Sequence, residues 1–147
     1  MGAVAVYQGQ IIARGHNCKE SERDPTAHAE MIALRQAARA RGGWRLLGVT
    51  LYCTLEPCPM CAGAMIQARL PRLVYAVDDP KAGAAGSILD LTRNPKLNHH
   101  IEVTRGVLAK EAESMLSRFF DALRSGDIMR YSQNWRADLL AENGKTM

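Results

Sequence analysis

The chain of 147 residues has few aromatic residues and no long hydrophobic run. Phe, Trp and Tyr together make up 5% of the residues, so the base-stacking surface of a single-strand binding protein is not expected. The apolar runs, of which residues 49–53 are typical, are far shorter than the roughly 20 residues that a transmembrane helix needs. The N-terminus also lacks the basic segment, apolar run and cleavage site of a signal peptide. We therefore expect a cytoplasmic protein without a membrane span.

Cysteine is scarce as well, with four in the chain. Without a signal peptide, four cysteines argue against a disulfide scaffold and favour a metal or redox site. The net charge of +4 is mild and favours an anionic partner. The length suits one compact domain. We expect residues 1–147 to form a single domain with its core at about residues 2–124, and the tail, residues 125–147, gives no clear signal.

The order of apolar patterns and turn residues predicts an α/β domain. Residues 4–7 and 11–14 are β-rich runs separated by a turn, which predicts an opening hairpin. Asp24 and Pro25 predict the start of an alanine-rich helix that ends at Gly42. We further expect strands at residues 49–54, 73–77 and 101–104, helices at residues 57–67 and about 109–124, and a short helical piece after residues 83–86. Such an order is typical of helices packed on a central sheet.

Two of the expected helices begin with residues that bind metals. His28-Ala29-Glu30 begins one helix, and Cys58 and Cys61 lie in the first turn of another. A spacing of three residues puts both sulfurs on one face, and the positive end of the helix favours their thiolate forms. One neutral histidine and two thiolates make three protein ligands around a zinc ion, which leaves the fourth tetrahedral position for water. The set formed by His28, Cys58 and Cys61 therefore predicts a catalytic zinc site.

Glu30 is the candidate catalytic residue. It follows His28 by two residues, and on a helix this spacing points the two side chains to different sides, so Glu30 is not well placed to be a ligand. Side chains in a first helical turn lean back toward the N-terminus, so its carboxylate can lie over the open position. We expect Glu30 to take a proton from water and return it later as a general acid.

Each of these features also has an ordinary structural explanation. Cys58 and Cys61 alone are equally typical of a redox pair or of half a structural zinc site. His28 and Glu30 alone are typical of a partly buried histidine and a solvated helix charge. The order favours a catalytic zinc, because His-x-Glu and Pro-Cys-x-x-Cys each stand at a strand-to-helix junction. Outside this set, we expect Cys53 to be a small buried hydrophobic residue and Cys18 a loop thiol without an assigned role.

These motifs resemble those of the zinc-dependent nucleoside and base deaminases, in the cytidine/deoxycytidylate deaminase-like superfamily. The resemblance is carried by His28-Ala29-Glu30 and by Thr-Leu-Glu-Pro-Cys-Pro-Met-Cys-Ala-Gly-Ala-Met at residues 54–65. Residues 24–30, residues 81–87 and Asn98-His99 narrow it to the bacterial tRNA-specific adenosine deaminases. The similarity extends from Gly2 to about Arg124.

The resemblance implies a three-layer fold, with a central mixed β-sheet and helices on both faces. Members of that family carry a helix before the first strand; the sequence given starts almost at the first expected strand, so we expect either a truncated start or the loss of this helix. The implied activity is hydrolytic deamination of adenosine to inosine at the wobble position of a tRNA anticodon, by a homodimer with one zinc ion per subunit. The resemblance also implies five substrate-binding residues. Asn17 would contact the purine, and Asp79, Lys81 and Asn98 would lie along the nucleotide path. Phe119 would lie in the C-terminal helix that lines the groove.

Three other functions remain open on the sequence. A guanine, cytosine or nucleotide deaminase would share the zinc site and differ in its pocket. A dithiol oxidoreductase would use Cys58 and Cys61 and would leave His28 and Glu30 without a role. A zinc-stapled binding module would need a fourth protein ligand; the candidates are His16, His99, His100, Cys18 and Cys53.

Overall fold

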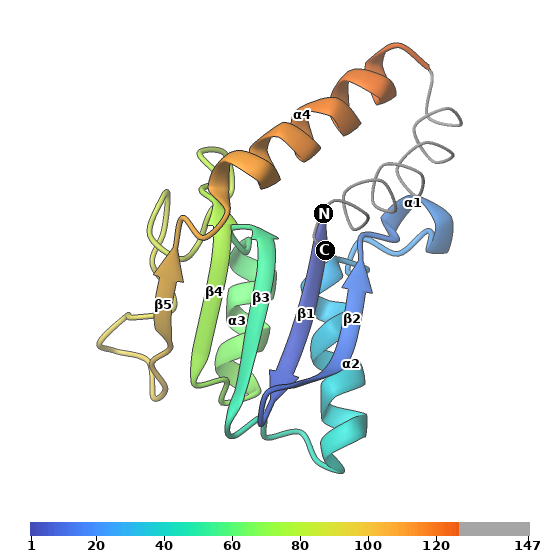
Figure 1. Ribbon diagram of the computed structural model, residues 1–147. Helices are drawn as coiled ribbons and strands as arrows, with labels where there is room; N and C mark the ends of the chain where they lie inside the picture. Colours follow the sequence, from blue (N-terminus) through green and yellow to red (C-terminus); the bar gives the residue numbers. More distant parts are fainter. Residues whose placement is uncertain (127–147) are drawn as a thin grey trace, which may run out of the picture. The chain divides into compact units, whose positions relative to one another are not determined.

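The computed structural model describes residues 1–126 of the chain. Met1–Ala112 form one compact unit, and the chain from Glu113 onward belongs to a second. The first unit contains a five-stranded mixed sheet (Figure 1). Its strands are β1 (Gly2–Tyr7), β2 (Gln10–His16), β3 (Val49–Leu55), β4 (Arg72–Val77) and β5 (Glu102–Arg105), arranged in the order β2-β1-β3-β4-β5. The mixed sheet expected from the sequence is therefore confirmed.

The strands divide into an antiparallel and a parallel half. Strand β1 pairs antiparallel with β2 and with β3, whereas β3, β4 and β5 run parallel. The hairpin between β1 and β2 turns at Gln8 and Gly9, whose φ angles of 49° and 76° are those of a type I′ turn. Parallel strands need a crossover connection, and helix α3 (Pro59–Gln67) provides it between β3 and β4. The carboxyl ends of β3 and β4 consequently lie at one edge of the sheet.

Helices α2 (Ala29–Arg41) and α3 both lie behind the sheet in the view of Figure 1, on the same face. Neither α2 nor α3 covers the opposite face of the sheet. Helix α2 ends at Gly42, which adopts the left-handed conformation that glycine favours. The expected helix start at Asp24 is wrong. The Asp24 carboxylate accepts hydrogen bonds from the backbone N–H and the hydroxyl of Thr26, which hold a turn, and α2 begins four residues later than Pro25.

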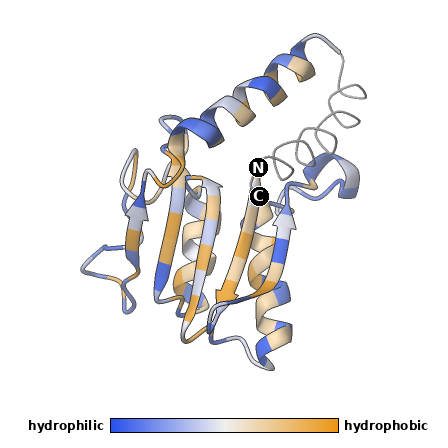
Figure 2. Cartoon of the chain, viewed as in Figure 1, coloured by the Kyte–Doolittle hydropathy of each residue, from blue (hydrophilic) through white to orange (hydrophobic). Residues whose placement is uncertain are grey.

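The core lies between the sheet and these two helices. Hydrophobic residues gather on the central strands (Figure 2), and Leu51, Leu73 and Tyr75 are buried against Met65 of α3. Small residues allow α2 to approach the hairpin closely. A Cβ atom at Gly15 of β2 would overlap the carbonyl oxygen of Ala29, so only glycine fits at this point. The close approach brings the start of α2 against the sheet.

Two connections differ from what the sequence predicts. The short helix α1 (Lys19–Glu22), which was not expected, follows β2. The short helical piece expected after residues 83–86 is wrong, because this segment is an irregular loop with an isolated β-bridge between Ala85 and Asp90. The first element of the chain is strand β1, as expected. Across residues 1–126, every helix is too short or too polar to cross a membrane.

Helix α4 (Ala109–Arg124) follows β5 and matches the helix expected there. The rings of Phe119 and Phe120 meet edge to face with centroids 5.5 Å apart. Near the end of the helix, Arg124 pairs with Asp121 one turn earlier. Helix α4 begins in the first unit and continues into the second. The expectation that the whole chain forms a single domain stays a prediction.

Candidate metal centre

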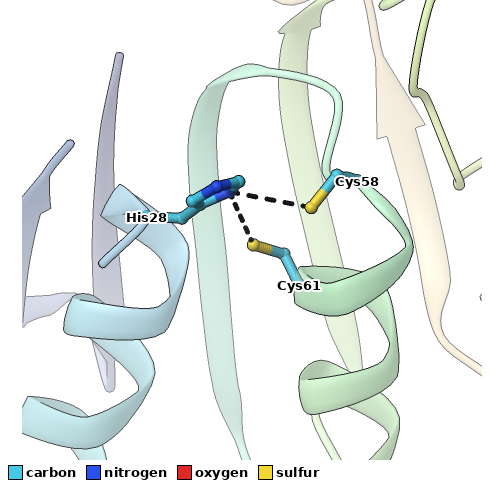
Figure 3. A group of neighbouring side chains, drawn as sticks. All are labelled: His28, Cys58 and Cys61. Atoms are coloured by element: carbon cyan, nitrogen blue, oxygen red, sulfur yellow. Dashed lines mark hydrogen bonds between the residues drawn. The ribbon is translucent and has the colours of Figure 1, made fainter. Parts of the chain in front are cut away.

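Three side chains from two helix starts converge on one point. The Nδ1 atom of His28 lies 3.6 Å from Sγ of Cys58 and 3.5 Å from Sγ of Cys61 (Figure 3). The three ligand atoms all lie within 4.8 Å of one another. The structure thus brings together the three residues that the sequence predicts as metal ligands, although His28 and Cys58 are thirty residues apart.

These distances fit a tetrahedral zinc ion. Zinc binds histidine nitrogen at about 2.0–2.1 Å and cysteine sulfur at about 2.3 Å, so a tetrahedral angle separates the two donor atoms by about 3.6 Å. The observed nitrogen–sulfur separations of 3.6 and 3.5 Å match this value. Imidazole and thiolate are also the donors that zinc prefers among protein ligands. Both the geometry and the chemistry of the donor set therefore suit zinc.

The backbone explains why these side chains converge. His28 and Cys58 are the N-cap residues of α2 and α3, and both have extended backbone angles. An N-cap side chain projects from the helix end instead of lying along its surface. Pro59 occupies the first position of α3, where its fixed φ angle fits and its missing N–H costs nothing. Cys61 lies in the same first turn, so its thiol stands beside that of Cys58.

The two thiols share a proton unequally. A hydrogen bond from the Cys61 thiol lowers the pKa of Cys58 to about 5; burial opposes this shift, and the backbone N–H groups of Cys61 and Met60 and the neighbouring His28 add to it. Donating that hydrogen bond and being buried both raise the pKa of Cys61. The Cys58 thiol is therefore the more readily ionised of the two. A bound dication stabilises the second thiolate as well.

Glu30 lies in the first turn of α2 and is 9% exposed. Burial raises the pKa of its carboxyl above the usual value, and the backbone N–H of Glu30, the nearby His28 and the Cys61 thiol oppose that shift in part. Its oxygens do not belong to the cluster of ligand atoms formed by His28, Cys58 and Cys61. A carboxyl group beside the metal ligands, outside their cluster and with a raised pKa, has the properties of a general acid and base.

Asn17 and Lys81, two of the predicted substrate-binding residues, lie on segments next to the metal cluster. The backbone N–H of Cys18 donates to the carbonyl of Ala27, which ties Asn17 to the segment that precedes His28. The side-chain oxygen of Asn17 accepts a hydrogen bond from the backbone N–H of Lys19, the first residue of α1.

Asp79 and Lys81 belong to the loop of residues 79–87, which follows β4. The Asp79 carboxylate accepts hydrogen bonds from the backbone N–H groups of Lys81 and Ala82, and Lys81 is exposed. The N–H of Ala84 in the same loop donates to the carbonyl of Pro57, directly before Cys58. The structure therefore attaches the loop to the start of α3.

Asn98 lies at the opposite end of α3 from the metal ligands. The side-chain oxygen of Asn98 accepts a hydrogen bond from Arg69, which follows the C-terminal end of α3, whereas Cys58 and Cys61 stand at its N-terminal end. Phe119 lies on α4 beyond the first unit. The roles assigned to these two residues in substrate binding stay predictions, as do those of Asn17, Asp79 and Lys81.

Among residues 1–126, only His28, Cys58 and Cys61 form a cluster that could hold a metal ion, and it has three members. The other histidines have partners of their own: His16 lies 3.3 Å from the Cys18 sulfur, and His99 and His100 contact backbone carbonyls. A zinc-stapled binding module needs a fourth protein ligand, which this part of the chain does not supply. Cys53 is buried in β3, as expected for a small hydrophobic residue.

Glu56 is a second buried carboxylate near the cluster. The sequence assigns no role to it beyond its place in the motif that contains Cys58. It is 1% exposed and lies between the end of β3 and the first ligand of α3. The sequence signal for a special role of Glu56 is a charged residue between an apolar strand and Pro-Cys. Its hydrogen-bond donors lie more than twenty residues away and are not evident from the sequence.

Comparisons with known proteins agree with this geometry. Residues 1–124 match the sequence pattern of the MafB19-like deaminase family. The tRNA-specific adenosine deaminase of Bacillus subtilis (strain 168) is 50% identical over 124 residues, which are 84% of this chain and 77% of that protein. A solved structure from studies of A-to-I editing by tRNA:A34 deaminases at the wobble position of transfer RNA is 43% identical, with a TM-score of 0.74 over 77% of this chain and 82% of that one.

More distant similarity extends to guanine deaminases. A solved structure of guanine deaminase from Nitrosomonas europaea is 27% identical, with a TM-score of 0.64 over 80% of this chain and 71% of that chain. The expected cytidine deaminase-like fold is thus confirmed by solved structures on which most of this chain superposes. On the family match, the identity to the curated relative and the His-Cys-Cys cluster, the chain belongs to the MafB19-like deaminases and, among them, to the family of bacterial tRNA-specific adenosine deaminases.

Proposed function

We propose that this protein hydrolyses adenosine to inosine at the wobble position of a tRNA anticodon. The observation that carries the proposal is the cluster of His28, Cys58 and Cys61 with the buried Glu30 beside it, in a chain that is 50% identical to a tRNA-specific adenosine deaminase. Zinc hydrolases use three protein ligands and an adjacent carboxylate in this manner. The proposed reaction converts adenosine and water to inosine and ammonia.

His28, Cys58 and Cys61 would hold the zinc ion. When bound with three protein ligands, zinc supplies Lewis-acid activation of water and lowers the pKa of that water to about 7. Glu30 would accept the proton that the water releases. Its carboxyl would then deliver that proton to N1 of the purine, take the second proton from the hydroxyl group added at C6, and pass it to the amino group, which departs as ammonia. The burial that raises the pKa of Glu30 suits this alternation between base and acid.

Asn17 and Lys81 supply the substrate contacts in this proposal. Asn17 would hydrogen-bond the purine that has been flipped out of the anticodon loop, because it is tied to the segment before His28. Lys81 is exposed on the loop attached to the start of α3 and would neutralise a flanking phosphate. Asp79 and Asn98 would lie along the same nucleotide path, and Phe119 would line its edge.

A homodimer with one zinc ion per subunit is part of the proposal, as is action in the cytoplasm on the tRNA anticodon stem-loop. Helix α3 contains a run of small residues and methionines, Met-Cys-Ala-Gly-Ala-Met, which allows a second helix to approach closely. A Cβ atom at Gly63 in this run would meet nothing within 4 Å. Light scattering on the purified protein should report twice the chain mass. A fully active monomer at micromolar concentration would contradict the dimer.

The alternative function is deamination of a free base, for which the similarity to the guanine deaminase is the specific observation. Both functions use the same zinc site, so substrate preference distinguishes them. An anticodon loop offers an unpaired adenosine that flips at low cost, and its phosphates add binding energy that a free base lacks.

The test measures ammonia release by zinc-loaded protein with three substrates: an anticodon stem-loop, free adenosine and free guanine. We expect efficient turnover of the stem-loop and poor turnover of the other two. The affinity for the stem-loop should fall with added salt, with a log–log slope of about −0.7 per neutralised phosphate. Efficient turnover of guanine without salt-sensitive RNA binding would favour the free-base deaminase.

A further inference from the structure

Glu56 is buried and makes all its hydrogen bonds to one loop. Its Oε1 atom accepts hydrogen bonds from the backbone N–H groups of Ala85 and Ser87, each at 3.0 Å. Its Oε2 atom accepts one from the backbone N–H of Asp79 at 2.9 Å and one from the hydroxyl of Ser87. Each carboxylate oxygen thus has two donors, and every donor belongs to the loop of residues 79–87.

The loop is shaped closely around this carboxylate. A Cβ atom at Gly83 would overlap both the Glu56 carboxylate and the backbone carbonyl of Asp79, so the loop can follow this path only with glycine at that position. Backbone hydrogen bonds extend the attachment: the N–H of Glu56 donates to the carbonyl of Val77, and that of Ala84 donates to the carbonyl of Pro57. A buried carboxylate is costly unless it is fully hydrogen-bonded, and here the loop provides all the donors.

Glu56 also stands next to the metal centre in the chain. It lies two positions before Cys58, the N-cap of α3 and one of the three clustered ligands. The loop that it holds carries Lys81, which is exposed. One side chain therefore connects the segment that carries a metal ligand to the segment that carries a cation for the substrate. Its oxygens are outside the ligand cluster, so it acts through the loop and not on the metal.

We propose that Glu56 is a positioning residue, which sets the loop of residues 79–87, and with it Lys81, in register with the metal ligand at the start of α3. The part of this proposal that concerns substrate binding rests on the proposed function. Loss of the carboxylate would release the loop and weaken the binding of the RNA, while the ligands and Glu30 stay in place.

The test compares Glu56→Gln with the matched variant Glu102→Gln, which makes the same change at an exposed position of β5. Gln keeps the shape of the side chain, but its amide nitrogen cannot accept a hydrogen bond from a backbone N–H. The loop donors that bond to one of the two carboxylate oxygens therefore lose their acceptor. Ser87→Ala is a milder second variant that removes only the hydroxyl donor. Three quantities are measured in each protein: zinc content, amide hydrogen exchange, and kcat and KM for the stem-loop.

In Glu56→Gln we expect amide exchange at Asp79, Ala85 and Ser87 to accelerate by about tenfold or more, because hydrogen bonds to charged groups are the strong ones. The KM for the stem-loop should rise by about tenfold, with kcat within about twofold of the wild type. Zinc content and the exchange of Met65 in α3 should be unchanged. Ser87→Ala should raise KM by about threefold, and Glu102→Gln should match the wild type.

Unchanged loop exchange in Glu56→Gln would overturn the proposal. So would a loss of zinc in step with activity, because that result would make Glu56 a support of the metal site. If Glu56→Gln does not fold, Ser87→Ala decides: faster loop exchange together with a higher KM at constant kcat supports the proposal, and unchanged loop exchange overturns it. If the wild type does not act on the stem-loop, the proposed function fails, while zinc content and loop exchange still test the positioning of the loop.

Discussion

His28 and Cys58 are the N-cap residues of two different helices, and the Nδ1 atom of one lies 3.6 Å from the Sγ atom of the other. The two positions are thirty residues apart, so the pair forms only when α2 and α3 have packed on the same face of the sheet. A ligand set that exists only in the folded chain couples metal binding to folding. Zinc should therefore stabilise the protein against unfolding.

The first prediction concerns this coupling. Cys58→Ala and Cys61→Ala should each lose most of the bound zinc, because two ligands hold the ion far more weakly than three. Cys18→Ala is the matched control, since Cys18 lies outside the cluster and pairs with His16. Metal analysis of the purified proteins checks the zinc content, and thermal unfolding with and without a chelator checks the stability. Full zinc occupancy in both cluster variants would refute the ligand assignment.

A second prediction separates contacts with the base from contacts with the phosphates. Lys81→Ala should flatten the log–log dependence of stem-loop affinity on salt by up to about 0.7, the value of one single-stranded phosphate contact. Asn17→Ala should lower turnover by about tenfold or more with little change in the salt slope, because the amide is proposed to hold the uncharged base and not a phosphate. A changed salt slope in Asn17→Ala, or none in Lys81→Ala, would reverse these roles.

Packing between α2 and β2 provides a third prediction. Gly15→Ala should lower the free energy of unfolding by about 2–3 kcal/mol, because the new Cβ overlaps the carbonyl oxygen of Ala29 and forces α2 outward. Gly43→Ala is the control, since a Cβ atom there meets nothing within 4 Å. Urea unfolding of both variants measures the difference. Equal stability of the two would show that the close approach at Gly15 is relaxed without cost.

The fourth prediction is a pH dependence at Asp90. Burial acts to raise the pKa of this carboxyl, but hydrogen bonds from Thr92 and Arg93 and the charge of Arg93 outweigh it and lower the pKa below its usual value. A folded-state pKa below the unfolded one contributes stability that is present above about pH 3.9 and is lost as the pH falls through the folded pKa.

Asp90→Asn should consequently lower the free energy of unfolding by about 0.5–1 kcal/mol at neutral pH, a modest value because the pair with Arg93 is largely exposed to solvent. The difference from the wild type should stay constant between pH 8 and 5 and shrink below about pH 4. Urea unfolding at several pH values checks it. A difference that grows on acidification would contradict the direction of the pKa shift.

Much of the fold was predictable because its signals are local. The β-rich runs before and after Gln8-Gly9 predict the hairpin, and Gly42 marks the end of α2 correctly. The start of α2 was placed too early because Asp24 and Pro25 have the chemistry of a helix start. In the structure the Asp24 side chain bonds to Thr26 within a turn, and His28 takes the N-cap position. Local capping signals do not distinguish these two outcomes.

The metal ligands were predictable from the sequence. Cys58 and Cys61 have the three-residue spacing that puts two side chains on one helix face, and His28 was identified by the order of the two motifs, His-x-Glu before Pro-Cys-x-x-Cys. The role of Glu56 was not predictable, because its donors are 23 to 31 residues distant along the chain and three of the four are backbone N–H groups without a sequence signature. The sequence predicts only a turn at residues 83–86 within this loop. Glu56 follows β3 and the loop follows β4, so their contact can be recognised only when the pairing of these two strands is known.

The fifth prediction tests the central claim, that His28, Cys58 and Cys61 hold zinc while Glu30 moves the proton. The measurement is a single-turnover assay of inosine formation in an anticodon stem-loop by the wild type and Glu30→Ala, with zinc content determined on the same samples. We predict about one zinc per chain in both proteins, and inosine formed by Glu30→Ala at a rate lower by about 10² to 10⁴, the usual contribution of a positioned acid or base. Loss of zinc from Glu30→Ala would make Glu30 a ligand, and inosine formation at the wild-type rate would exclude it as the catalytic residue.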